Sequence, residues 1–121
     1  MIKDAYEFDS NKFVWTKLKQ TGDVPKPRDD HSLCKIDDMS FLIFGGFVSE
    51  YRVNESYKCC KNGFTLQWEK FACNSAPKPC IRASHSAVCH NGKVYIYAGQ
   101  DDENNKLSDL WELDLASEQF C

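Results

Sequence analysis

Two runs of the chain, residues 40–44 and 93–98, are apolar at nearly every position. Such runs, bounded by turn residues, are typical of β-strands that are covered on both faces. Each run follows another predicted strand, at 31–36 and 85–90, and the second pair is joined by Asn91-Gly92, a dipeptide that favours a two-residue hairpin. Further strands, each with an aromatic residue, are predicted at 4–8, 13–18, 56–60, 66–71 and 109–113. The pattern therefore predicts an all-β chain in which helix is nearly absent.

The same order of residues recurs about 53 positions further along the chain. An Arg-x-x-His-Ser segment, a small pair after the apolar run and an aromatic residue in the next strand appear twice. The two sets are Arg28, His31, Gly45, Gly46 and Tyr57, then Arg82, His85, Ala98, Gly99 and Trp111. Trp68 follows Tyr57 much as Trp15 follows Tyr6. Repeats of this length built from short strands are typical of β-propeller blades, each of which is one small sheet.

This order of residues resembles the kelch repeat, and the resemblance covers roughly residues 4–120. It implies kelch-type β-propeller blades, which are four-stranded antiparallel sheets. Residues 1–20 would then supply the last two strands of one blade, 28–71 a complete blade and 82–121 most of a third. Since propellers close with roughly four to eight blades, we expect a partial ring. Either the rest of a longer polypeptide or copies of this chain would complete it.

Composition narrows the class of partner. The formal net charge is −3 at pH 7 and there is no basic stripe, so the chain is not expected to bind nucleic acid. No apolar run is long enough for a signal peptide or a membrane span, and we expect no membrane partner. The seven cysteines are an odd number, which argues against a complete disulfide framework. A reducing, cytoplasmic location is therefore expected.

The sequence offers little for catalysis or metal binding. His31 and His85 occupy the same repeat position, whereas a catalytic group is needed once. We therefore expect both imidazoles to be buried and to bridge backbone groups of adjacent strands. Structural zinc usually needs two cysteines separated by two to four residues, and no two cysteines of this chain have that spacing. We expect no catalytic residue, no metal and no cofactor, and hence no enzyme.

The loops offer a better candidate site. In a four-stranded blade, the loop between the second and third strands emerges on the same face as the connection between blades. We expect a partner to bind there, through Phe47, Glu50, Tyr51 and Arg52 of one loop and Asp101, Asp102 and Glu103 of the next. Aromatic residues and arginine are enriched at binding hot spots, although acidic loops are also common as solvated surface. Arg28 and Arg82, at the strand entrances, either brace the blades or add to this face.

Kelch domains that resemble this chain capture other proteins. The function we expect is protein–protein interaction or scaffolding within a larger intracellular protein. The alternative is a regulatory or targeting propeller, for example an actin-binding one, attached to an enzyme. A third interpretation is structural, with self-association of copies that close one ring head to tail. In each case the partner is another protein or peptide.

Overall fold

The computed structural model describes residues 3–71 and 76–121 and contains, in those residues, twelve strands and no helix. They form a six-stranded sheet, a four-stranded sheet and a separate two-stranded hairpin. The strands in chain order are β1 (Ala5–Asp9), β2 (Val14–Gly22), β3 (Ser32–Asp37), β4 (Ser40–Phe44), β5 (Phe47–Val48), β6 (Tyr51–Arg52), β7 (Ser56–Asn62), β8 (Thr65–Lys70), β9 (Ser86–His90), β10 (Lys93–Gln100), β11 (Lys106–Asp114) and β12 (Gln119–Phe120). The predicted all-β fold class is confirmed.

The central blade consists of β8, β7, β4 and β3 in that spatial order, and each neighbouring pair is antiparallel. Its β4 occupies the apolar run 40–44, where Leu42 and Phe44 are 1% exposed and Ile43 is 5% exposed. Successive side chains of a strand point to opposite faces, so both faces of β4 are covered, as the nearly continuous apolar run predicts. At the β3–β4 turn, the Asp37 carboxylate accepts a hydrogen bond from the Met39 amide at 2.9 Å, which closes the turn.

The last blade consists of β12, β11, β10 and β9 in spatial order. At its first turn, Asn91 (φ 50°) and Gly92 (φ 74°) both have positive φ, which the predicted Asn-Gly hairpin requires. The short fourth strand β12 pairs Phe120 with Leu113 of β11. Both of these side chains enter the hydrophobic core, so even a two-residue strand completes the apolar face of the blade.

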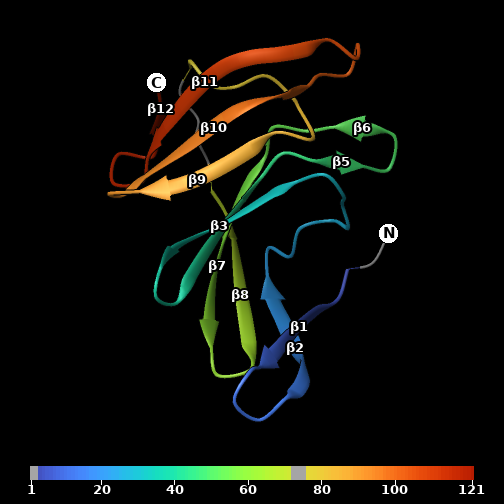
Figure 1. Cartoon of the computed structure of the whole chain (residues 1–121), viewed down its shortest axis with the longest axis vertical. Helices are drawn as coiled ribbons and strands as arrows, with labels where there is room; N and C mark the ends of the chain where they lie inside the picture. Colours follow the sequence, from blue (N-terminus) through green and yellow to red (C-terminus); the bar gives the residue numbers. More distant parts are fainter. Residues whose placement is uncertain (1–2, 72–75) are drawn as a thin grey trace.

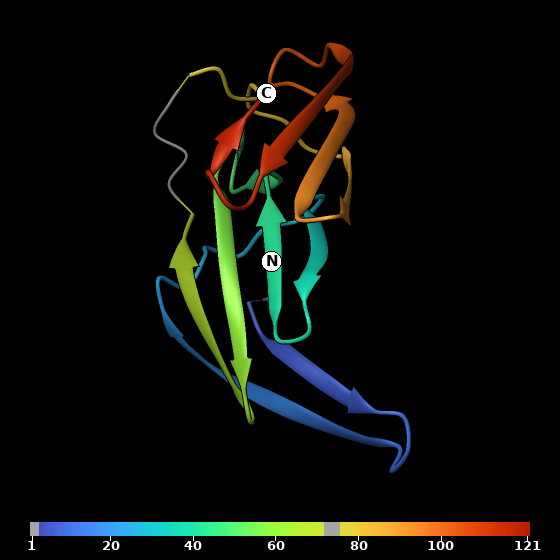
Figure 2. The ribbon, with the colours of Figure 1, turned by 90° about the vertical axis from the view of Figure 1, so that its left-hand side faces the viewer.

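The first hairpin, β1–β2, joins the central blade at its outer edge. Residues 19–22 of β2 run parallel to residues 65–68 of β8, which gives the six-stranded sheet the order β1-β2-β8-β7-β4-β3. Figure 2 shows the hairpin crossing obliquely beneath the central strands, so the sheet curls. Met1 and Ile2 lie outside the described residues. The assignment of residues 1–20 to a preceding blade stays a prediction.

Two apolar clusters hold these parts together. The larger cluster lies between the central and last blades, and its buried members are Leu42, Phe44, Val94, Ile96, Leu113 and Phe120. The smaller cluster lies between the hairpin and the central blade, and its buried members are Leu18, Cys59 and Leu66. Figure 1 shows the last blade, coloured orange to red, stacked on the central blade with β9 beside β3. Packing of one sheet face on the next is thus the main contact between blades.

Candidate interaction surface

Each blade contains one arginine that links three parts of its own repeat. Arg82 is 0% exposed. Its guanidinium donates to both carboxylate oxygens of Asp109, at 2.7 and 2.8 Å, to the Ala98 carbonyl at 3.0 Å and to the Cys80 carbonyl at 3.2 Å. The hydrogen bonds from Arg82 are the main reason why the pKa of the Asp109 carboxyl falls to about 2. The ion pair therefore ties the entrance of the blade to its second and third strands.

Arg28 makes the corresponding contacts one blade earlier. Its guanidinium donates to the Lys26 carbonyl at 3.2 Å, to the Gly45 carbonyl at 3.1 Å and to the Glu55 carboxylate at 3.2 Å. It also lies 5.3 Å from the centroid of the Tyr57 ring, within the range of a cation–π contact. Both repeat arginines are buried, and their guanidinium groups donate to carbonyls and a carboxylate of their own blades.

The glycine at the second position of each small pair, Gly46 or Gly99, lies against the Arg-x-x-His segment of its own repeat. A Cβ built on Gly46 (φ 103°) would lie 2.8 Å from the carbonyl oxygen of Asp29. A Cβ on Gly99 (φ 99°) would lie 2.7 Å from the carbonyl oxygen of Ala83. Both the backbone conformation and the close approach exclude a side chain here, which explains why glycine occurs at this position in both repeats.

The two repeat histidines have different surroundings. His85 is half-buried, its Nε2 lies 2.8 Å from the Ser32 hydroxyl of the central blade, and its ring meets Phe44 edge-on at 5.3 Å. Burial is the main cause that lowers the pKa of His85 to about 4. His31 is exposed. The prediction of two buried imidazoles is therefore wrong for His31, which no described blade covers, whereas His85 is half-buried between strands of two blades.

The loops predicted to bind a partner meet at the junction of the two blades. The loop after β4 contains the hairpin β5–β6, which the sequence pattern does not predict. The Arg52 amide donates to the Asp102 carboxylate at 2.8 Å, and the Arg52 guanidinium donates to the Asp101 carbonyl at 2.9 Å. The same guanidinium lies 5.7 Å from the centroid of the Phe47 ring. These contacts join loops from two repeats into one surface, termed here the loop face (residues 47–52 and 100–105).

The loop face combines a fixed base with exposed side chains. The Asp101 carboxylate closes its own loop by accepting the amide of Glu103 at 3.0 Å. Phe47, Arg52 and Asp101 are half-buried, whereas Tyr51, at the tip of β5–β6, is 66% exposed. Glu50, Asp102 and Glu103 are also exposed. Of the residues predicted from the sequence, the exposed ones are those that a partner can reach directly, namely Glu50, Tyr51, Asp102 and Glu103. The half-buried ones, Phe47, Arg52 and Asp101, hold the surface in shape.

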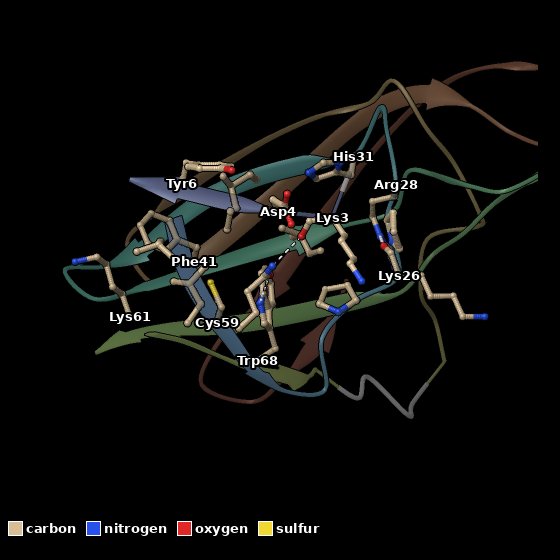
Figure 3. Close-up of a pocket in the computed structure, with 18 of the residues that line it drawn as sticks. Lys3, Asp4, Tyr6, Lys26, Arg28, His31, Phe41, Cys59, Lys61 and Trp68 are labelled. Atoms are coloured by element: carbon tan, nitrogen blue, oxygen red, sulfur yellow. Dashed lines mark hydrogen bonds between the residues drawn. The ribbon is translucent and has the colours of Figure 1, made fainter. Parts of the chain in front are cut away.

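A groove of about 440 Å³ lies between the β1–β2 hairpin and the central blade. Its apolar walls include Leu33, Phe41 and Ile43. Figure 3 shows Arg28 and His31 near one end of the groove and Phe41 near the other. The lining comes from segments far apart in the chain, each of which has an ordinary strand pattern. The sequence around each lining residue therefore does not indicate that a groove is present.

Hydrogen bonds across the groove fix the hairpin. The Trp68 indole N–H donates to the side-chain oxygen of Gln20 at 2.9 Å, and the Gln20 amide donates to the Lys3 carbonyl at 2.7 Å (Figure 3). At the far end, Lys61 pairs with Glu7 at 2.7 Å. The conspicuous repeat residue Trp68 thus connects the central blade to the first hairpin, while Trp111 donates to Asp109 within its own blade at 2.7 Å.

Residues 3–71 and 76–121 give no sign of a metal site or of a membrane-spanning helix. No group of three or more His, Cys, Asp or Glu side chains there is arranged to hold a metal ion. The same residues include no helix that could span a bilayer. The described cysteines are unpaired, and they are Cys34, Cys59, Cys60, Cys80, Cys89 and Cys121. Burial raises the pKa of the Cys34 thiol to about 11, so this thiol packs as an apolar group.

The fold and its repeated contacts define the class of protein. Four-stranded antiparallel sheets follow one another, pack face to face and repeat the same arginine and glycine contacts. This combination is typical of β-propeller blades built from sequence repeats. The chain is therefore a propeller segment.

Comparison with known proteins gives the family. Residues 1–121 match the family model described as the KLHDC2/KLHL20/DRC7 Kelch-repeats domain, and the chain belongs to this kelch-repeat family. It is 32% identical over 98% of its length to the leucine-zipper-like transcriptional regulator 1 homolog of Drosophila melanogaster and 30% identical over 93% to human host cell factor 1. It is 26% identical over 98% to the dynein alpha chain of the flagellar outer arm of Chlamydomonas reinhardtii. The chain spans 12%, 6% and 3% of these three proteins, respectively.

Proposed function

We propose that the chain is a non-catalytic protein-recognition module that binds another protein or peptide through the loop face. The observation that carries this proposal is the joining of two loops by Arg52, which donates to Asp101 and Asp102 of the next repeat. A surface fixed in this way loses little conformational freedom when a partner binds. Membership of the kelch-repeat family supports the same function.

The exposed part of the loop face supports one class of partner. Tyr51 offers a large ring with a polar tip, and aromatic residues of this kind dominate binding hot spots. Within residues 47–52 and 100–105, the exposed charged side chains are acidic, namely Glu50, Asp102 and Glu103. A partner with a basic patch around an apolar contact is the best complement to this surface.

The test is capture of partners by the immobilised chain, with bound proteins quantified by mass spectrometry. The variant Tyr51→Ala is expected to reduce the specifically captured partner about tenfold or more, because alanine replacement of a hot-spot residue removes about 2 kcal/mol of binding. The matched control is Phe64→Ala, since Phe64 is 61% exposed and lies at the turn after β7, at the opposite end of the central blade. Equal loss with both variants, or no loss with Tyr51→Ala, would rule out the loop face.

A second candidate function is a targeting propeller attached to an enzyme, for instance one that binds actin. The relative named as a flagellar dynein alpha chain favours it, since the matched segment is only 3% of that protein. Co-sedimentation with filamentous actin separates the two candidates, because only the second includes a filament as partner. We also propose a cytoplasmic location, to which the unpaired thiols of the described cysteines are suited.

A further inference from the structure

Two of the described cysteines lie in the contact between the central and last blades. Cys34 of β3 and Cys89 of β9 are both half-buried, and in its strand each lies between two exposed residues. Both pack against the larger apolar cluster, as do Ile36 of β3 and Ala87 of β9. Since alternate side chains of a strand share one face, the two thiols point into the same gap from opposite sides.

The two thiols also lie at nearly the same level along their strands. β3 and β9 lie side by side in different sheets and run in the same direction (Figure 1). The Ser84 amide donates to the Asp30 carbonyl at 2.9 Å, which fixes the starts of the two strands against each other. Cys34 is four residues beyond Asp30, and Cys89 is five residues beyond Ser84. One residue of a strand spans about 3.3 Å, so the difference in level is small.

Electrostatics gives a second sign that the two sulfur atoms are close. The pKa of the Cys34 thiol is raised to about 11, mainly by burial and also by the negative charge of a Cys89 thiolate. Such an effect of one charge on another group requires a short distance between them. Because the thiolate is the reactive form of cysteine, the pair reacts slowly at neutral pH, and a small uncharged oxidant is best suited to reach it.

The repeat does not account for either cysteine. One repeat later, Val88 stands at the position of Cys34, and one repeat earlier, Lys35 stands at the position of Cys89. Both of these counterparts are exposed. A pair of thiols in the contact is therefore a feature of this junction and not of the blade. The remaining described cysteines are Cys59, which packs in the smaller cluster, and the exposed Cys60, Cys80 and Cys121.

We propose that Cys34 and Cys89 form a reversible disulfide when a peroxide is present, and that this bond locks the central blade to the last blade. The sulfur of one thiolate attacks hydrogen peroxide, the O–O bond breaks and hydroxide leaves, which gives a sulfenic acid. The other thiol attacks this sulfur, so an S–S bond forms, the S–O bond breaks and the oxygen leaves as water. In total, the two thiols lose two electrons and one hydrogen peroxide gains them, which gives one disulfide and two molecules of water. A thiol such as glutathione reverses the reaction by exchange and is itself oxidised to its disulfide.

The disulfide changes how firmly the two blades are held. In proteins built from repeats, each contact between neighbours makes its own contribution to stability. Between β3 and β9, the contact is apolar packing beyond the Ser84–Asp30 and His85–Ser32 hydrogen bonds at one end. The disulfide adds a covalent link and encloses β4 to β8 in one loop. Because closing a loop restricts the unfolded chain, the unfolding equilibrium constant of the oxidised form is expected to be about a hundredfold lower.

The first measurement identifies the linked cysteines and needs no variant. The whole chain is treated with hydrogen peroxide, free thiols are blocked with N-ethylmaleimide in denaturant, and the protein is digested with trypsin without reduction. Trypsin cuts after lysine and arginine, so Cys34 and Cys89 are released in residues 29–35 and 83–93, each with one cysteine. We expect mass spectrometry to find these two peptides joined, with a mass two hydrogens below their sum, and to find them separate after treatment with dithiothreitol.

The second measurement is urea unfolding of the oxidised and the reduced chain, followed by tryptophan fluorescence. The variant Cys34→Val leaves an apolar side chain of similar size without a thiol. It is expected to abolish both the joined peptides and the stabilisation by peroxide. The matched control is Cys121→Ser, since Cys121 is exposed and lies outside the gap between the blades. This variant is expected to keep both effects.

Several outcomes overturn the proposal. Recovery of both peptides with the blocking group, or with a sulfinic acid in place of the joined pair, would show that the disulfide does not form. Joined peptides found only in a dimer on a non-reducing gel would assign the bond to two chains. An equal stabilisation of the Cys34→Val variant would assign the effect to other cysteines. Tyr51→Ala is expected to leave oxidation unchanged, so this proposal and the loop face are tested independently.

Discussion

Replacement of Arg82 by alanine tests whether the repeat arginine braces its blade. The side chain is 0% exposed and donates to both oxygens of Asp109 and to the carbonyls of Ala98 and Cys80. Truncation removes all of these hydrogen bonds at once. It also leaves the half-buried Ala98 carbonyl without this donor, and an acceptor that loses its partner where water has limited access is costly.

The expected loss is about 3 kcal/mol of unfolding free energy. Removing one partner of a buried ion pair costs about 3–5 kcal/mol. The Asp109 side chain, however, is 42% exposed, so water resolvates part of its charge and the loss falls at the low end of that range. Since the total stability of a domain is about 5–15 kcal/mol, the variant is expected to be visibly less stable. Lysine cannot reproduce the forked geometry, so Arg82→Lys is expected to recover less than half of the loss.

The assay is urea unfolding followed by the fluorescence of the three tryptophans, among them Trp111 beside Asp109. The matched control is Lys35→Ala, because Lys35 is 60% exposed and lies 4.0 Å from Asp38, and exposed pairs contribute under about 1 kcal/mol. A double-mutant cycle of Arg82→Ala with Asp109→Ala is expected to give a coupling of about 1 kcal/mol or more. A loss below about 1 kcal/mol for Arg82→Ala, or a coupling near zero, would refute the bracing role.

Two other predictions concern the contact between blades. Gly45→Ala is expected to lower the free energy of unfolding by about 2–3 kcal/mol, because the added Cβ would lie 2.8 Å from both the Arg82 carbonyl oxygen and the His85 ring. The control is Gly63→Ala, since Gly63 has a similar φ and nothing within 4 Å of the added Cβ. It is expected to cost only about 1 kcal/mol. Equal losses in urea unfolding would argue against the contact. Lowering the pH from 7 to 5 is expected to cost about 1–2 kcal/mol, because His85 has a pKa of about 4 in the folded chain and 6.5 when unfolded. The unfolded state binds the proton first, so this stability is full above pH 6.5 and falls as the pH drops toward 4. The variant His85→Gln is expected to lose less over that interval, and an identical loss would assign the titration to other groups.

The strands of this chain could be predicted because their signals are local. The nearly continuous apolar run at 40–44 coincides with β4, and Asn91-Gly92 forms the hairpin turn that this dipeptide favours. The repeat gives information that local patterns do not contain. A residue that recurs at the same position of each repeat has a structural role in every blade. Arg28 and Arg82 show this, because their contacts to the backbone and to an acid correspond one by one.

The rest of the surface depends on contacts between distant residues. Arg52 reaches Asp102 across 50 positions of sequence, so nothing near either residue indicates that the two loops form one surface. The parallel pairing of β2 with β8 likewise joins residues 19–22 to 65–68 and follows no repeat rule. The prediction that His31 is buried is wrong for the same reason, since burial there depends on contacts with distant residues. The repeat position of this histidine matches that of His85, but burial at that position comes from the neighbouring blade, which a single repeat does not contain.

The two positions of the glycine pair depend on different contacts, one with the next repeat and one within the same repeat. Ala98 stands at the position of Gly45 and has nearly the same φ, 62° against 64°, so the backbone at this position tolerates a Cβ at modest cost. What excludes a Cβ at Gly45 is the next repeat, whose Arg82 carbonyl and His85 ring approach to 2.8 Å. The second glycine, Gly46 or Gly99, is required by its own repeat instead. A Cβ at the first position of the pair would therefore disturb the contact between blades, and a Cβ at the second position would disturb the fold of the blade itself.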